Sequence, residues 1–309
     1  LLPGAKAVYV TIALSGLTAL GAEVIWTREL ALLLGGSTYT FSIILAVFLA
    51  GIGGGSSVGS YAAHRLTRPR LALGLCQLLL VVWMAWSAYA IARSLPYWPV
   101  IPGLTSSPWF LFQLDLVRCV YAIFPAACLW GASFPLALAA VASDRHDAGR
   151  VVGAVYAANT VGAIAGALLF SIVLIPVLGT QDAQRVLILT AACAAGLMLF
   201  PFARSARARA ALGFATAVTG ALVWSIAPIP FELIAYGRQA AGALNSATEL
   251  YRGEGINSTI AVSESLKDPG VRFFHVSGKI EASNTPQDMR LQLLLGNLPA
   301  LLHPKPASV

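Results

Sequence analysis

The stretch STIAVSES (258–265), followed by VRFFHVSGKIEAS (271–283), decides the fold of the C-terminal part of this chain. Large apolar and smaller residues alternate along the first stretch, where Ile260 and Val262 share one side. Such alternation predicts half-buried β-strands. The intervening residues 267–270 read Lys-Asp-Pro-Gly, a composition typical of a turn. The sequence therefore predicts a small β-hairpin.

A helix is expected directly after the hairpin. Pro286 fits the first helical turn, where a missing backbone N–H costs nothing. Apolar residues then recur at helical spacing, at Met289, Leu293, Leu294 and Leu298. We therefore expect residues 229–309 to form a linker followed by a β-hairpin and helix module.

The succession of strands, Gly turn and a helix closing in NLP…HP.P..V resembles the N-terminal β-domain and linker of spermidine synthases. It more closely resembles the membrane-fused spermidine synthase-like proteins, which carry this module after a block of major-facilitator-like transmembrane helices. The resemblance spans most of the chain. It implies a transferase of the polyamine aminopropyltransferase family, with decarboxylated S-adenosylmethionine as the donor.

The resemblance also implies substrate-binding positions. Where the family has Gln residues in its hairpin that help hold the donor, this chain has Asn257 and Glu281. Gln292 matches a family Gln near the amine substrate, and Asn297 matches the Asn before Leu-Pro. The family's nucleotide-binding loop and catalytic Asp would lie beyond Val309. We therefore expect a fragment with no catalytic residue and no bound cofactor of its own, joined to a C-terminal catalytic domain or chain.

Composition points to a membrane protein. Of the 309 residues, 58% are hydrophobic and only 11% are charged, and the mean hydropathy is +0.76. Soluble domains carry roughly a quarter charged residues. The net charge of +7 comes entirely from residues 1–228. The basic residues there are expected in loops that orient the spans and meet anionic lipid. Nucleic acid is therefore not an expected partner. We expect a multi-pass protein of the plasma (inner) membrane.

The first 228 residues are expected to form an all-α polytopic membrane helix bundle. A spanning helix needs about 20 mostly apolar residues. About seven stretches meet that requirement: 7–27, 39–62, 71–92, 116–142, 151–177, 183–203 and 208–227. The four Cys residues lie in apolar runs at spacings that match no metal motif, so no metal site is expected.

Polar residues within the first span are candidates for function. GAEVIWTREL (21–30) places Glu23 inside an apolar run and Arg28 at its edge, and it resembles an E-x-x-W-x-R signature of the fused family. An ionisable group at membrane depth is costly and is a candidate for substrate or proton handling. A structural carboxylate, paired within the bundle, is the alternative. Trp26 fits a belt residue at the membrane interface.

Three further polar residues lie in later spans. Asp115 and Arg118 are three residues apart, so they share a helix face and are expected to pair. Asn159 either hydrogen-bonds between helices or lines a cavity. A small-residue face is expected to allow close helix packing, because glycines recur every four residues at Gly51, Gly55 and Gly59.

The side of the membrane on which the module lies stays open. Arginine is concentrated in the loops after the second, fourth and sixth spans, which should therefore be cytoplasmic. Seven spans would place Tyr251 outside, whereas the donor implied by the resemblance would be inside. Either one span does not cross, or the module does not use that donor. A transferase, a transporter-like bundle for a polyamine or other small solute, and a non-catalytic membrane scaffold are the candidate functions.

Overall fold

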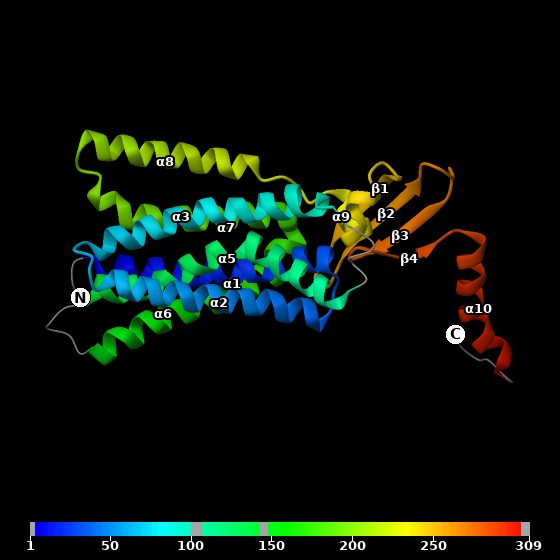
Figure 1. The fold of residues 1–309 in the computed structure, drawn as a ribbon, viewed down its shortest axis with the longest axis horizontal. Coiled ribbons are helices and arrows are strands. Elements are labelled where there is room, and N and C mark those ends of the chain that lie inside the picture. The colour runs from blue at the N-terminus through cyan, green and yellow to red at the C-terminus, as the bar shows by residue number, and fades with distance from the viewer. Residues whose placement is uncertain (1–3, 100–106, 143–147, 304–309) are drawn as a thin grey trace.

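The computed structural model describes residues 4–99, 107–142 and 148–303, which form a long helical bundle with a small sheet at one end (Figure 1). The bundle helices are α1 Ala5–Leu34, α2 Thr38–Ala63, α3 Pro69–Tyr89, α5 Pro108–Val141, α6 Ala148–Leu168, α7 Ile175–Leu199 and α8 Ala206–Ser225. Short π- and 3₁₀-helical segments extend them: η1 Ala90–Ser94, η2 Leu95–Tyr97, η3 Leu169–Leu174 and η4 Phe200–Phe202.

The bundle has the helices of a multi-pass membrane protein. Within the described residues, five helical runs are long and apolar enough to cross a bilayer, namely Ala5–Leu34, Thr38–Ala63, Pro69–Tyr97, Pro108–Val141 and Gly149–Phe202. The predicted count of about seven is not confirmed. The expected fifth and sixth spans form one continuous run, and α8, the expected seventh, is not among the five.

A glycine reverses the chain within the longest run. Gly179 has φ 81° and ψ 165°, a left-handed backbone conformation that is unstrained only for glycine. On either side of it, α6 and α7 both pack against α1 and run in opposite directions along the bundle (Figure 1). Gly179, where the chain turns back from α6 into α7, therefore lies at the end of the bundle that carries the sheet.

Glycines bring α2 and α5 into close contact. Gly51, Gly55 and Gly59 are buried on one face of α2, opposite Ala127 and the backbones of Cys128 and Ala132 on α5. The predicted small-residue packing face is confirmed.

The sheet is larger than the predicted hairpin. Four antiparallel strands pair in the order β1-β2-β3-β4, a meander in which each strand follows its neighbour. The strands are β1 Ala247–Glu254, β2 Thr259–Ser265, β3 Arg272–Val276 and β4 Lys279–Ser283, and α9 Phe231–Tyr236 and η5 Gly237–Gly242 precede them. The predicted turn at 267–270 joins β2 to β3.

The inner face of the sheet is polar and tightly packed. Burial alternates along β2, and the small residues, including Ser263, face inward while Ile260 and Val262 are half-buried. His275 on β3 is fully buried and bonds through Nε2 to Ser263 Oγ (2.8 Å) and through Nδ1 to the Ala235 carbonyl (3.0 Å). Burial lowers the pKa of His275 from its ordinary 6.5, against the opposing effect of the Ala235 carbonyl. This imidazole therefore holds α9 on the sheet as a neutral group.

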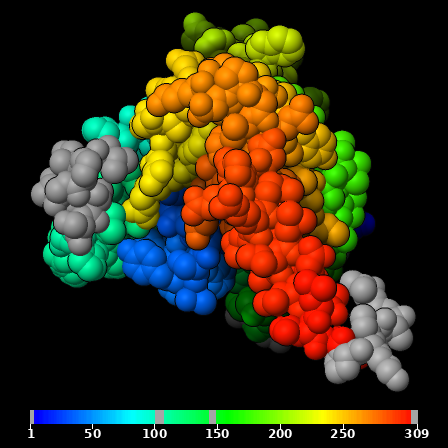
Figure 2. Space-filling model, turned by 90° about the vertical axis from the view of Figure 1, so that its right-hand side faces the viewer, coloured from blue at the N-terminus to red at the C-terminus, as the bar shows by residue number. Residues whose placement is uncertain are grey.

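The last helix, α10 Pro286–Leu302, begins at Pro286 as predicted and projects away from the sheet (Figures 1 and 2). None of its residues is buried. Its exposed apolar side chains include Leu291, Leu294, Leu295 and Leu298.

The sheet and the arginine-rich loops lie at opposite ends of the bundle (Figure 1). Six arginines lie at the connections from α2 to α3 and from α7 to α8. Arg65, Arg68 and Arg204 are in the connections themselves, and three more, at 70, 207 and 209, are in the first turns of α3 and α8. The sheet instead contacts the end of α1 and the region around Gly179. Basic connections remain in the cytoplasm. The charge distribution therefore predicts, without showing it, that the sheet lies on the non-cytoplasmic side.

Cysteine labelling in intact cells tests this orientation. In a background without native cysteines, we expect Lys267→Cys, in the exposed β2–β3 turn, to react with a membrane-impermeant maleimide. Leu66→Cys, in the exposed connection after α2, should react only after permeabilisation. The reverse pattern would contradict this orientation and place the sheet in the cytoplasm.

Candidate functional site

The chemistry-bearing residues gather where the bundle meets the sheet. Three bundle helices, α1, α2 and α5, have an end at this junction, and the reversal at Gly179 also lies there. The segment α9–η5 and the β1–β2 turn approach from the sheet. Helix ends expose unpaired backbone groups, so charged side chains near them can bind backbone atoms and each other.

Arg28 attaches the β1–β2 turn to α1. Its guanidinium donates to the carbonyls of Gly255 (2.7 Å) and Ser258 (3.1 Å) and to Thr259 Oγ1 (3.1 Å). A longer bond reaches the Ile256 carbonyl at 3.4 Å. A planar guanidinium presents several donors in a fixed geometry, which suits a turn whose carbonyls converge. The predicted candidate Arg28 is therefore a docking residue for the sheet.

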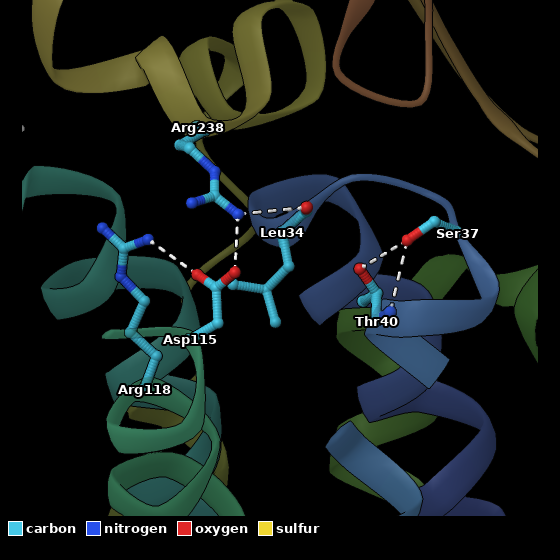
Figure 3. A network of polar contacts seen from close by, with 6 residues as sticks. All are labelled: Leu34, Ser37, Thr40, Asp115, Arg118 and Arg238. Atoms are coloured by element: carbon cyan, nitrogen blue, oxygen red, sulfur yellow. Dashed lines mark hydrogen bonds and ion pairs between the residues drawn. The ribbon is translucent and has the colours of Figure 1, made fainter. Parts of the chain in front are cut away.

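Asp115 lies between two arginines at the same end of the bundle (Figure 3). Its Oδ1 is 3.5 Å from Arg118 Nη1, as the three-residue spacing predicts, and its Oδ2 is 2.8 Å from Arg238 Nη2. Arg238 also donates to the Leu34 carbonyl at 3.2 Å. Asp115 and Arg118 are each 1% exposed. The network thus joins α5, η5 and the end of α1 around one buried carboxylate.

Two more carboxylates bind α7. Glu29 is 1% exposed, and its Oε1 accepts a bond from Gln184 Nε2, while no partner in the described part of the chain reaches its Oε2. Glu254 on β1 accepts bonds from the backbone N–H (2.8 Å) and the hydroxyl of Thr180. The sequence interpretation placed Glu29 at the edge of the first span, beside Arg28, and did not include it among the candidate residues, whereas α1 continues to Leu34 and buries it.

Two cavities open at this junction. The larger, about 640 Å³, lies between the start of α2, the α9–η5 segment and the β3–β4 turn. The second, about 450 Å³, follows α1 from Leu20 to Ala31 and is closed by α2, η3 and the β1–β2 turn. Three predicted site residues line this second cavity: Glu23, Arg28 and Asn257.

The remaining predicted residues do not converge. Asn159 lies on α6 against Gly16 of α1, a packing position between helices. Glu281 is exposed on β4 and Asn297 is exposed on α10. Gln292 donates to the Ser283 carbonyl at 3.2 Å, which ties α10 to the end of β4. Glu281, Gln292 and Asn297 therefore do not share a pocket with Asn257, which lines the 450 Å³ cavity.

Among the described residues, no group of three or more His, Cys, Asp or Glu side chains is arranged to hold a metal ion. The junction is instead a set of ion pairs and single charges around two cavities. Comparison of the chain with protein-family models, with curated proteins and with solved structures finds no match.

Proposed function

We propose that this chain is the membrane-bound part of a spermidine synthase-like protein of the aminopropyltransferase family. The observation that carries the proposal is the order of elements after the bundle. Four antiparallel strands lead directly into a helix that carries Gln292 and Asn297, the two positions that match the family's motif. The bundle anchors this module firmly through Arg28 and Arg238.

Aminopropyl transfer needs more than this module. The amine nitrogen attacks the carbon next to the donor's sulfonium, the carbon–sulfur bond breaks, and a base takes the amine proton. The exposed leucines of α10 offer an apolar surface for a catalytic domain or chain that would hold decarboxylated S-adenosylmethionine. In this proposal, Gln292 lies near the amine and the bundle fixes the module at the membrane surface.

Release of 5′-methylthioadenosine tests the transferase activity. Protein isolated from its native membrane, with whatever partner it carries, is expected to release this product only when an amine is added. Gln292→Ala should lower the rate, whereas Gln287→Ala, an exposed position on the same helix, should not. Release that needs no amine, or no release with any amine from putrescine upward, would exclude the activity.

A second candidate is a transporter-like bundle that binds an amine in the 450 Å³ cavity. Glu23 lines this cavity and has no hydrogen bond or ion pair within the described residues, while Arg28 is already bound to the β1–β2 turn. Glu23 lies 11 residues before Leu34, about 16 Å at 1.5 Å per residue, which is near the bilayer centre. The π-helical η3 contributes Ser171 to the wall, and π-helical turns are frequent at functional sites.

Uptake of radiolabelled spermidine into proteoliposomes tests this second candidate. Glu23→Gln is expected to abolish uptake, because the half-buried Glu23 is the only acidic group among the described residues that line the cavity. Asp268→Asn, in an exposed turn, should leave uptake unchanged. Unchanged uptake by Glu23→Gln would remove Glu23 from the mechanism. The cysteine labelling described above distinguishes the two candidates: a sheet on the non-cytoplasmic side would favour the transporter, because a cytoplasmic donor could not reach the module, and a cytoplasmic sheet would favour the transferase.

A further inference from the structure

The 640 Å³ cavity at the junction is bordered by three segments that are distant in sequence. Gly35, Gly36 and Ser37 at the start of α2 form one wall, the segment around Arg238 forms the second, and the β3–β4 turn with Lys279 forms the third. Figure 2 views the molecule from this end, where the blue start of α2, the yellow η5 and the orange-red β4 surround a hollow.

The charged side chains that line the cavity are both cationic. Arg238 and Lys279 are among its lining residues, and no carboxylate is. The nearest carboxylate in the ion-pair network, Asp115, is shared between Arg118 and Arg238 (Figure 3). Two guanidinium groups therefore face one carboxylate, which leaves an excess positive charge beside the cavity even before Lys279 is counted.

Arg238 has a donor left over. Its Nη2 binds Asp115 and the Leu34 carbonyl, but its Nη1 is buried and has no hydrogen-bond partner in the described part of the chain. A buried N–H without an acceptor is costly and rare in folded proteins. This buried atom has no surface open to the cavity, but the side chain as a whole is 27% exposed and lines it, so an anion there would still face the positive charge of Arg238.

The start of α2 adds a third positive element. This 26-residue helix begins at Thr38, and the Ser37 hydroxyl caps only the Thr40 N–H, at 3.2 Å. The other N–H groups of a first helical turn carry partial positive charge and bind anions. Because Gly36 and Ser37 line the cavity, this helix end lies at its wall.

We infer that this cavity binds a phosphate-type anion, held by Arg238, Lys279 and the first turn of α2. A lipid headgroup is a natural source of the phosphate. The 30 residues of α1 span about 45 Å, close to the thickness of a bilayer with its headgroups. The end of α1 at Leu34, and the cavity beside it, therefore lie at headgroup depth. Free phosphate from solution offers the same chemistry.

Calorimetry on the full chain in phosphatidylcholine nanodiscs tests this inference with two probes, short-chain phosphatidic acid and inorganic phosphate. At least one is expected to bind, more weakly as salt rises. Lys279→Gln should weaken binding about tenfold, equivalent to ~1.4 kcal/mol. The matched control is Lys267→Gln, in an exposed turn of the same sheet, which should not weaken binding.

The two probes separate the sources of the anion. Binding of the lipid alone identifies a headgroup site, and binding of inorganic phosphate as well identifies a site for the anion itself. Arg238→Gln is a second variant, and its folding can be checked by thermal unfolding without ligand. Absence of binding by both probes, or equal binding by the parent and Lys279→Gln, would overturn the inference. Neither result affects the transferase or uptake assays, which do not use this cavity.

Discussion

Asp115→Asn is expected to destabilise the bundle by about 3–5 kcal/mol, the usual cost of removing one partner from a buried ion pair. The substitution keeps the size of the side chain and removes its charge. Arg118, 1% exposed, would then keep a full positive charge with no carboxylate beside it. The single amide oxygen of Asn could accept from only one of the two arginines and would carry no charge, so the contact between η5 and the bundle end would weaken as well.

Thermal unfolding in detergent, with the fluorescence of the tryptophans as signal, measures this effect. The matched control is Asp182→Asn, which breaks another pair at the same three-residue spacing on a helix. Asp182 and Arg185 are 50% and 32% exposed, so this control should cost less than about 1 kcal/mol. Asp115→Glu should recover part of the loss, because it restores the charge. Equal melting temperatures for Asp115→Asn and Asp182→Asn would contradict the role of the buried pair.

Much of the fold follows from local sequence patterns. Apolar runs of spanning length predicted the bundle, and alternation along residues 258–265 predicted a strand that β2 matches closely. Pro286 marked the first turn of α10. The number of spans did not follow, because hydropathy shows where a helix is apolar and not where the chain reverses. Gly179 reverses it within one apolar run.

The candidate site was predictable only where partners are close in sequence. The Asp115–Arg118 pair follows from helix geometry, but the contact from Asp115 to Arg238 joins residues 123 positions apart. No local pattern identifies such a partner. Trp26 shows the same limitation. It was expected in the aromatic belt at the membrane interface, but it is 2% exposed, and its ring centroid lies 5.4 Å from that of Trp130 in the core. The sequence position of Trp26 along the helix indicates its depth in the membrane. Whether its side chain points to lipid or to the core depends on the neighbouring helices.

Gly55→Ala and Gly54→Ala are expected to change stability in opposite directions, although both add one methyl group to α2. A Cβ at Gly55 would overlap the backbone carbonyl of Cys128 on α5, which cannot move without separating the helices. Overpacking of this kind costs about 1–3 kcal/mol. Gly54 has no neighbour within 4 Å of that position, so its replacement should gain up to about 1 kcal/mol of helix propensity.

Unfolding of both variants in the same detergent provides the comparison, because sequence context, helix and depth are nearly identical. The helix-propensity gain is common to the two substitutions, so the difference between their unfolding free energies reports the contact with α5 alone. A clear destabilisation by Gly55→Ala alone would establish that α2 and α5 meet through their backbones, as membrane helices with small-residue faces do. Stabilisation by both variants would show that the helices are further apart, and the glycines would then have no packing role.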